Sequence, residues 1–477
     1  MQALLQDGGR DWSAQMLHDA RQAAQALLNG TGTRVLATLL DNSAAFVVID
    51  EACAQAEVIH SPLPLFFSAQ QIGLALQSAG VDTLIAEPSA AAMWAELPWR
   101  QVCVADRLLQ MAKLRPEEVT YPPGTRKITY TSGSTGAPKG VCLRQDDLDR
   151  VAGSVVQSLR PLGIARHLSA LPYSVLLENI AGQMAARRQG ATLITLPMTD
   201  LGWVGSSQFD PARFHAAVQT HQPHSLIVLP QMLRAWCGYL RQHRQTAPSG
   251  LKFVAVGGAA VGKPLLDAAH SLKIPAFEGY GLSEGASVQT LNLPGAQRPG
   301  SVGRALPHSQ LRIGADAEIE IKGSLMAAYL GQSAPMPEWW PSGDLGEIDA
   351  DGYVFIRGRK KNILISAYGR NISPEWVETT LTGQESILQA AVFGDGEPSL
   401  WAVLWPVRPE ACDDDLQHAV DQANATLPDY ARISRWVRAK DGFDTRSGYA
   451  TANGRPRRAS ILAAHCAADA ALCPTNE

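Results

Sequence analysis

The sequence has no excess of basic residues and no paired cysteines. Lysine and arginine total 41 against 45 aspartate and glutamate, which gives a formal net charge of −4. Such a balance cannot neutralise a nucleic-acid backbone, so nonspecific nucleic-acid binding is excluded. The 7 cysteines are an odd number, scattered without a Cys-x-x-Cys pair, which argues against a disulfide framework or a zinc cluster. We therefore expect reduced thiols in a cytoplasmic protein that does not bind nucleic acid.

Long apolar runs are also missing. No stretch of about 18 uninterrupted apolar residues occurs, which is the length that a membrane-spanning helix needs. With 46% hydrophobic and 18% charged residues, the chain can nevertheless bury a large core. We expect a globular protein with no transmembrane segment. Its 477 residues correspond to about three domains, or to two large ones.

The first 300 or so residues alternate between helical and strand patterns. Helical periodicity over 13–30 gives way to the extended run RVLATLL, and the alternation continues to about residue 87. It resumes after residue 125 with the apolar strands KITYT, HLSALPY, ATLITLP, SLIVLP and KFVAVGG. Near-continuous apolar strands are typical of sheets covered on both faces. The pattern predicts an α/β fold built of βα-alternating sheets.

The hydrophobic pattern of the sequence changes after about residue 300. The segments QLRIG, EIEIKG and YVFIRGR alternate with period two, which predicts an antiparallel, β-rich subdomain. The charged run RGRKKN then precedes a region of α+β character that contains PEWVETTL, LQAAVFG and LWAVLWP. We place the boundary at Lys361. This predicts a large N-terminal domain over residues 1–361 and a small, mobile α+β domain over residues 362–477.

A run rich in glycine and hydroxyl residues follows the strand pattern that ends near residue 131. The segment from Tyr130 to Val141 reads YTSGSTGAPKGV. Its backbone N–H groups and hydroxyls can surround phosphate oxygens while Lys139 supplies positive charge. It is not a Walker A loop, because Pro138 replaces the second glycine of that motif and Gly140 its Ser or Thr. We predict a polyphosphate-binding loop, with an ordinary Ser/Gly turn as the alternative.

A different enzyme class is indicated by the pentapeptide at 281–285. The sequence GLSEG matches G-x-S-x-G, the nucleophile elbow of α/β-hydrolases, and Asp344 and His465 follow Ser283 in the order that such a triad needs. The elbow requires a helix directly after the serine, whereas the chain continues with the short, β-branched segment ASVQTLNLPG. A hydrolase that uses Ser283 is therefore the least favoured function.

The loop at 130–141 resembles the signature loop of the adenylate-forming superfamily of AMP-binding enzymes. That superfamily contains acyl- and aryl-CoA synthetases, peptide-synthetase adenylation domains and luciferases. Other blocks that resemble the family follow in order: LPY at 171–173, GGA at 257–259, EGYGLSE at 278–284, GSVGR at 300–304, SGDLG at 342–346, GRKKN at 358–362 and NISP at 371–374. The resemblance spans roughly residues 30–460 and lies nearest to the long-chain acyl-CoA synthetases.

The resemblance implies how ATP is held while a carboxylate attacks its α-phosphorus. That reaction needs the triphosphate fixed in line and its charge neutralised. The implied phosphate-binding residues are Thr131, Ser132, Gly133, Ser134, Thr135, Gly136 and Lys139. The implied residues around adenine are Gly258, Ala259, Glu278, Gly279, Tyr280 and Gly281, with Tyr280 stacked on the base.

Four further roles follow from the same resemblance. Ser283 would meet the α-phosphate and Glu284 would hold Mg²⁺. Asp344 would bind the ribose hydroxyls with help from Arg359, since a carboxylate can accept two hydrogen bonds from a diol. Lys361 would be the hinge between the two domains, where the chain must absorb a large φ/ψ change. The alternative for Lys361 is a solvated basic linker.

The segment 171–182 favours an apolar acid as the substrate. The resemblance places Tyr173 and Val175 beside the acid. Peptide-synthetase domains that select amino acids carry an Asp in this region, and none stands between Leu171 and Gly182. Val175 stands where many acyl and aryl relatives have His, which changes the electrostatics near the carboxylate. A fatty or other apolar acyl group is the expected substrate.

The C-terminal block departs from the family at its catalytic lysine. The sequence TANGRPRR at 451–458 resembles the family ending T-x-x-G-K-x-x-R but has Arg455 at the lysine position. Arginine keeps the positive charge, yet its planar fork differs in shape from a compact ammonium. The implied catalytic residues are Arg455, Thr135 and Lys139.

Three functions are compatible with that substitution. In the first, ATP and Mg²⁺ convert the carboxylic acid to an acyl-adenylate with release of pyrophosphate, and coenzyme A then takes the acyl group as a thioester. In the second, the acceptor is the phosphopantetheine of an acyl carrier protein, or another thiol or amine. In the third, the chain binds nucleotide or acyl ligand with only weak chemistry. The resemblance favours the first, an AMP-forming acid–thiol ligase.

Overall fold

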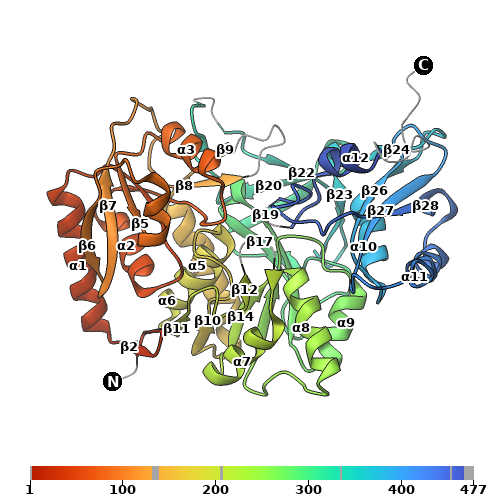
Figure 1. Cartoon of the computed structure of the whole chain (residues 1–477), viewed down its shortest axis with the longest axis horizontal. Coiled ribbons are helices and arrows are strands. Elements are labelled where there is room, and N and C mark those ends of the chain that lie inside the picture. The colour runs from red at the N-terminus through yellow and green to blue at the C-terminus, as the bar shows by residue number, and fades with distance from the viewer. Residues whose placement is uncertain (1–2, 132–138, 205–207, 333–335, 452–453, 467–477) are drawn as a thin grey trace.

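The computed structural model describes residues 3–131, 139–204, 208–332, 336–451 and 454–466. Figure 1 shows helix α1 (Ala14–Gly30) and helix α11 (Asp413–Thr426) at opposite ends of the long axis, with the large sheets between them. Serine side chains begin the first helices: Ser13 caps α1, Ser43 caps α2 (Ala44–Gln55) and Ser68 caps α3 (Ala69–Ser78). Each hydroxyl accepts an N–H from the first turn, which fixes where the helix starts.

The first large sheet has the strand order β18-β17-β16-β15-β14-β10-β11-β1-β2. Its strands are β1 (Leu5–Asp7), β2 (Arg10–Trp12), β10 (Arg166–Leu168), β11 (Thr192–Thr195), β14 (Ser225–Val228), β15 (Phe253–Val256), β16 (Ala276–Leu282), β17 (Ser287–Leu291) and β18 (Arg304–Ala305). Strands β11, β10, β14, β15 and β16 run parallel to one another. Strands β17 and β18 are added to the β16 edge in antiparallel orientation.

Helices cover both faces of this sheet. On one face Phe214, Trp236 and Leu265 pack on the strands from α7 (Pro211–His221), α8 (Pro230–Gln242) and α9 (Lys263–Ser271). On the other face lie α5 (Gln145–Leu159) and a π-helix, Leu177–Met184, which leads into α6 (Ala185–Gln189). Two-sided cover explains why every residue of β11 and β14 is buried.

The second large sheet has the strand order β21-β9-β8-β4-β3-β5-β7-β6. Its strands are β3 (Val35–Leu39), β4 (Ile59–Pro62), β5 (Thr83–Ala86), β6 (Arg100–Val104), β7 (Arg107–Lys113), β8 (Thr125–Thr131), β9 (Lys139–Arg144) and β21 (Ala328–Tyr329). Alternate residues of β3 face opposite ways. Leu36 joins the core under α1 and α2, whereas Val35, Ala37 and Leu39 join the core under α3 and α4 (Pro88–Ala91). Helix α2 packs on strands of both large sheets and so lies between them.

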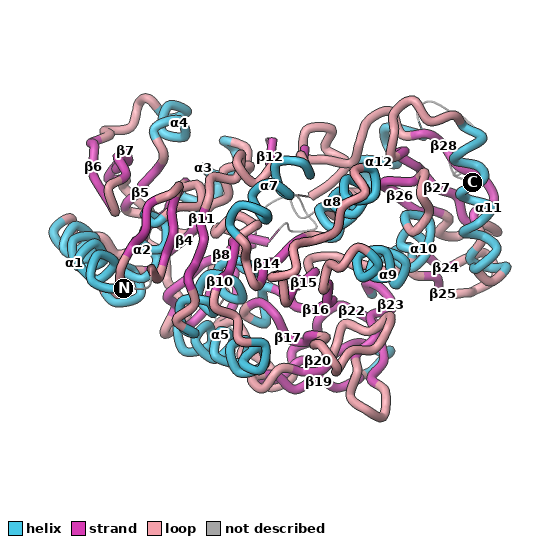
Figure 2. Tube along the Cα trace, turned by 90° about the horizontal axis from the view of Figure 1, so that it is seen from below, coloured by secondary structure: helices cyan, strands magenta, loops and turns pink. Residues whose placement is uncertain are grey.

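The β-rich subdomain is an antiparallel sheet of order β19-β20-β22-β23, with β19 (Ser309–Ile313), β20 (Glu318–Gly323), β22 (Trp340–Ile348) and β23 (Val354–Arg359). A short hairpin of β12 (Trp203–Val204) and β13 (Gln208–Phe209) lies apart from it in sequence. The C-terminal region contains β24 (Leu364–Ile365), β25 (Asn371–Ile372), α10 (Pro374–Thr382), β26 (Ile387–Phe393), β27 (Leu400–Pro406), β28 (Ile433–Arg438) and α12 (Arg458–Cys466). Figure 2 shows these elements grouped at one end of the molecule.

The α/β architecture with its β-rich subdomain and α+β C-terminal region is the one predicted from the sequence. One segment differs. The apolar run HLSALPY is strand only as far as Leu168, and a loop and the π-helix follow it. In the parts of the chain that the structure describes, no helix is long and apolar enough to cross a membrane.

Candidate active site

Strand β16 carries most of the block EGYGLSE and pairs with β17. Their register shifts between Tyr280 and Gly281, so a bulge turns the strand at this point. A Cβ at Gly281 would overlap the carbonyl oxygen of Ser287, so only glycine fits. The bulge leaves Tyr280 half-buried, with its hydroxyl directed at the neighbouring subdomain.

The carboxylate of Asp344 lies between a tyrosine hydroxyl and a guanidinium. Tyr280 Oη donates to Asp344 Oδ2 at 2.7 Å, and Arg359 Nε lies 2.8 Å from Asp344 Oδ1. Asp344 and Arg359 face each other across β22 and β23, which fixes their pairing. Burial raises the pKa of Asp344, and the charge of Arg359 opposes that rise. The remaining lone pairs of this carboxylate can accept two more donors, such as those of a vicinal diol.

Cationic side chains from three separate segments lie near enough to act on one another, and two of them, Arg359 and Arg455, also act on this carboxylate. Partial burial lowers the pKa of Lys361, and the positive charges of Arg359, Arg455 and Lys139 lower it further. The carboxylates near these groups are those of Asp344 and Glu375. Gathered like charges repel one another, so an anion that binds among them gains more than it would at an isolated cation. The arrangement suits a ligand with several negative charges.

Arg455 reaches this region from the C-terminal part of the chain. Its Nη2 donates to the backbone oxygen of Gly258 at 3.2 Å. Next to it, a Cβ at Gly454 would come within 2.7 Å of Gln231 Oε1 on α8, so the two parts of the chain are in close contact here. The residue at the position of the family lysine therefore lies beside the turn that follows β15.

Glu278 supports that turn from beneath. Its Oε1 accepts the N–H of Val261 at 3.0 Å, and the residue is buried. Gly258 in the same turn has φ +89°, which favours glycine. Burial raises the pKa of Glu278 to about 7. The side chain thus shapes the predicted adenine region from within the protein, while Ala259 is exposed on the turn itself.

Exchanging Glu278 for glutamine is expected to change the pH dependence of stability. The wild-type carboxyl keeps its proton in the folded state up to about pH 7, whereas the unfolded chain ionises near its ordinary pKa of 4.5. The wild type therefore loses stability as the pH rises between those two values, and the variant does not. The free energy of unfolding of Glu278→Gln relative to wild type should rise by about 2–3 kcal/mol between pH 4.5 and 8 in urea titrations. A difference that stays constant with pH would contradict the buried, neutral carboxyl.

The predicted magnesium ligand, Glu284, lies in a polar corner beside the phosphate-loop hairpin. Tyr329 Oη donates to Glu284 Oε1 at 2.7 Å, and Lys139 Nζ lies 5.6 Å from the centre of the Tyr329 ring. Donation to one oxygen leaves the second available to a metal ion. Mg²⁺ in nucleotide sites is commonly held by one or two carboxylates, phosphate oxygens and water. The donor set present here fits that pattern.

The two ends of the phosphate loop are adjacent. Thr131 ends β8 and Lys139 begins β9, and these two residues face each other across the antiparallel pair. Of these two ends, Lys139 lies beside the Tyr329 ring. The predicted loop residues Ser132, Gly133, Ser134, Thr135 and Gly136 lie outside the described residues.

The predicted acid-binding residues Tyr173 and Val175 lie in different surroundings. The Tyr173 ring is buried against Phe46, with ring centres 5.2 Å apart, and its backbone N–H donates to Asn42 Oδ1 at 2.8 Å. Val175 is half-buried at the start of the π-helix. The next half-buried side chain, Leu177, approaches the position of a Cβ on Gly257 to 3.5 Å. Tyr173 therefore anchors the segment through the core, and Leu177 reaches the Gly257–Gly258 turn.

The serine hydrolase triad is not assembled. Ser283 begins a single 3₁₀ turn, Ser283–Gly285, and strand β17 follows in place of the required helix. The buried ring of His465 bonds at Nδ1 to the carbonyl of Ile461 and at Nε2 to the N–H of Lys440, within the C-terminal region. Asp344 is engaged by Tyr280 and Arg359 instead.

Three residues of this site were not identified from the sequence. Tyr329, Asn42 and Leu177 belong to none of the motifs, and they reach the site only because β21, the end of β3 and the π-helix are brought there by the fold. The LPYSVLLEN segment could have drawn attention to Leu177, but nothing local marks Tyr329 or Asn42.

The family models, together with the fold, place the chain among the adenylate-forming enzymes. The structure of O-succinylbenzoate coenzyme A synthetase (MenE) from Bacillus subtilis, in complex with ATP and magnesium ion, superimposes with a TM-score of 0.75 at 21% sequence identity, covering 96% of each chain. The family model described as AMP-binding enzyme matches residues 2–326, and that of the AMP-binding enzyme C-terminal domain matches residues 361–465. The chain belongs to the AMP-binding enzyme family, as its sequence blocks predicted, and it is an AMP-forming acid–thiol ligase by class.

Characterised relatives differ in the acid that their names state. Long-chain-fatty-acid–CoA ligase FadD15 of Mycobacterium bovis is 26% identical over 81% of this chain and 75% of its own length. 2-Succinylbenzoate–CoA ligase of Bacillus velezensis is 30% identical over 60% of this chain. The matched stretch spans 59% of that ligase. Both belong to the acyl- and aryl-CoA ligases, and they do not agree on the substrate.

Proposed function

We propose that this protein activates an apolar carboxylic acid with ATP, forming an acyl-adenylate and pyrophosphate, and then passes the acyl group to coenzyme A. One observation carries the proposal. Arg359 pairs with Asp344, and the positive charges of Arg359, Arg455 and Lys139 act on Lys361, so cations for a polyphosphate and an acceptor for a ribose belong to one region. A protein promotes reactions at the phosphates of ATP by positioning the reacting groups and neutralising their charge.

The chain offers a contact for each part of ATP. Tyr280 lies where adenine would stack, and Asp344 with Arg359 would take the ribose hydroxyls. Lys139 and the loop residues from Thr131 to Gly136, with Ser283, would hold the phosphates. Glu284, supported by the Tyr329 hydroxyl, would hold Mg²⁺, which when bound adds positive charge at the phosphate oxygens.

An apolar acid fits the segment that follows Pro172. The side chains nearest to the Cβ positions of Gly257 and Gly258 are those of Leu177 and Leu229, both hydrocarbon. Val175 lies on the same stretch. A fatty acid and an aryl acid both meet this requirement, and we propose a fatty or other apolar acyl group as the substrate. The names of the relatives cover both kinds.

Arg455 is proposed to act in the adenylation step. Its guanidinium already contacts the carbonyl of Gly258, beside the region where the acid and the α-phosphate would meet. Four other N–H donors remain for negative charge that develops there.

Replacing Lys361 with proline is expected to separate the two half-reactions. Lys361 is exposed in a single turn, Lys360–Asn362, between β23 and β24, and the domain boundary is proposed there. Proline fixes φ and so blocks the backbone rotation that thioester formation would need. Pyrophosphate release in the first turnover should stay within about 3-fold of wild type while thioester formation falls about 10-fold or more. Lys361→Ala, which keeps backbone freedom, should retain both, and equal loss of both steps in the proline variant would count against a hinge.

The proposed function is tested by pyrophosphate exchange with a panel of acids. With ATP and Mg²⁺, we expect exchange with fatty or aryl acids and background with amino acids. Coenzyme A and a carrier-protein phosphopantetheine are then compared as acceptors. Preference for the carrier would favour the carrier-loading alternative, and background exchange with every acid would leave only a binding protein.

A further inference from the structure

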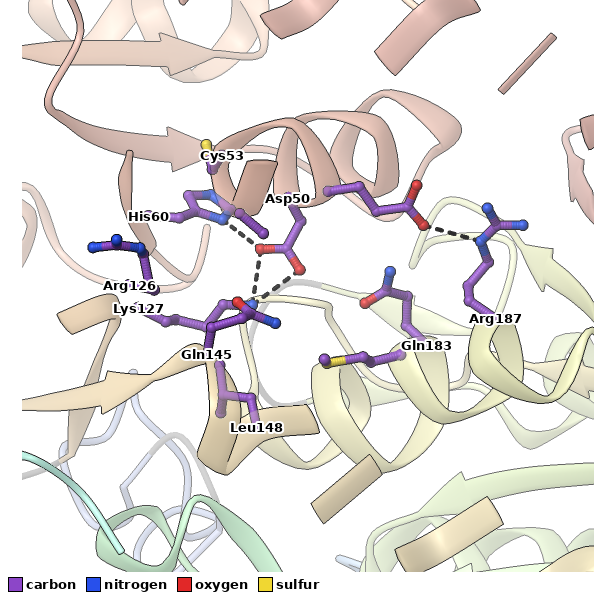
Figure 3. A pocket seen from close by; sticks show the side chains of 12 residues that line it. Asp50, Cys53, His60, Arg126, Lys127, Gln145, Leu148, Gln183 and Arg187 are labelled. Atoms are coloured by element: carbon purple, nitrogen blue, oxygen red, sulfur yellow. Dashed lines mark hydrogen bonds and ion pairs between the residues drawn. The ribbon is translucent and has the colours of Figure 1, made fainter. Parts of the chain in front are cut away.

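A cluster of buried polar side chains lies away from the nucleotide residues, between the two large sheets. Asp50 on α2 sits between His60 Nδ1, at 2.6 Å, and Lys127 Nζ, at 2.8 Å (Figure 3). Lys127 also donates to Asn179 Oδ1, and Asn179 Nδ2 donates to Asp50 Oδ2 at 3.1 Å. His60, Lys127 and Asn179 are at most 5% exposed. Charges buried to this degree are kept only when each is well paired.

Part of this cluster has the order of a catalytic triad. Thr38 Oγ1 lies 2.9 Å from His60 Nε2, and His60 is bonded to Asp50. Two facts argue against catalysis here. Thr38 is 1% exposed on strand β3, so no substrate reaches its hydroxyl. The ammonium of Lys127 already neutralises Asp50, which removes the charge that would stabilise a protonated His60.

The cluster joins the elements that lead to the two substrates. Lys127 is on β8, whose last residue, Thr131, opens the phosphate loop. Asn179 is on the π-helix, directly after the segment that carries Val175 and Leu177. Asp50 accepts from both Lys127 and Asn179, so a closed set of hydrogen bonds ties β8 to the π-helix through α2.

The other side of the π-helix is tied to the first large sheet. Glu178 Oε1 lies 3.0 Å from His167 Nε2, and Glu178 Oε2 accepts the N–H of Leu171 at 3.3 Å. A Cβ at Gly182 would overlap the Glu178 carboxylate, so this glycine makes room for the contact. The π-helix is therefore held by polar groups toward both sheets. Directional bonds of this kind fix orientation in a way that apolar packing does not.

We propose that Lys127, held by Asp50 and Asn179, is a positioning residue that fixes the π-helix against strand β8 and so sets where the acid's carboxylate lies relative to the α-phosphate. The inference rests on the proposed adenylation. Misplacement by about 1 Å can cost roughly 10²-fold in rate, so a remote tether can affect the chemical step without contacting substrate.

The test compares Lys127→Met with the double variant Asp50→Asn/Lys127→Met. The single variant leaves the buried Asp50 carboxylate without its ammonium partner and should lower Tm, whereas the double variant removes both charges and should regain most of it. If Lys127 positions the π-helix, pyrophosphate release in both variants falls about 10-fold or more, while the KM for ATP stays within about 2-fold. A rate that recovers together with Tm in the double variant would overturn the proposal.

Lys113→Met is the control on the same sheet: it removes a more exposed ion pair, to Asp82 at 2.9 Å, that does not involve the π-helix. It should leave the rate unchanged, and a loss equal to that of Lys127→Met would overturn the proposal.

Hydrogen exchange separates this proposal from the proposed function. If wild type releases no pyrophosphate with any acid, the proposed function is wrong. Hydrogen exchange alone then tests whether Lys127 positions the π-helix. Faster exchange confined to 127–131 and 177–184 in the double variant supports it. Unchanged exchange there, or faster exchange throughout, contradicts it.

Discussion

Replacing Arg455 with alanine is expected to slow acyl-adenylate formation by about 10²- to 10³-fold, with ATP affinity changed by no more than about 3-fold. The guanidinium of Arg455 bonds to Gly258, where the attacking carboxylate and the α-phosphate would meet, whereas Arg359 holds the Asp344 carboxylate proposed for ribose. The loss of Arg455 should therefore destabilise the transition state more than it weakens the binding of nucleotide. Single-turnover pyrophosphate release and nucleotide titration measure the two quantities separately.

Arg455→Lys is the matched comparison. Lysine keeps the charge and restores the family's residue, so its rate should equal or exceed that of wild type. Arg457→Ala removes an exposed arginine from the same block and should have little effect. An unaltered rate in Arg455→Ala would show that another residue supplies the charge.

Replacing Asp344 with alanine is expected to raise the KM for ATP about 100-fold. The carboxylate is proposed to accept two ribose hydroxyls, and hydrogen bonds to a charged group contribute about 1.5–3 kcal/mol each. The variant also frees Tyr280 Oη and the Arg359 guanidinium, which Asp344 now holds in place. Initial rates over a range of ATP concentrations, with the acid saturating, measure the effect.

Asp316→Ala is the control for that variant. Its carboxylate belongs to the same subdomain but is exposed, and it pairs with solvent-facing Lys360 at 3.2 Å. Its KM for ATP should stay within about 2-fold of wild type, because exposed ion pairs contribute little. If the KM for ATP is unchanged in Asp344→Ala, Asp344 does not bind the ribose hydroxyls.

The sequence predicted the fold class because its strands and helices have clear periods and its motifs stand in order. Contacts between residues of one motif could be predicted from the sequence for the same reason. Contacts between segments were not: Tyr280 and Asp344 are 64 residues apart and meet only when the β-rich sheet packs beside β16. Strand alternation could have paired Asp344 with Arg359, given the hairpin of β22 and β23.

The segment around Tyr173 shows where motif matching misleads. Its resemblance to an acyl-pocket block predicts a substrate contact, yet the ring lies in the core with Phe46. The π-helix that follows has no local signature either. Its geometry accompanies buried polar contacts from Glu178 and Asn179 to two different sheets, and such contacts become visible only in three dimensions.

The most direct test of the central claim is a crystal structure with a non-hydrolysable ATP analogue and Mg²⁺. We expect density for the adenine base against the Tyr280 ring, for the ribose hydroxyls on Asp344 and for the phosphates beside Lys139. Nucleotide density at any other place on the molecule would contradict it.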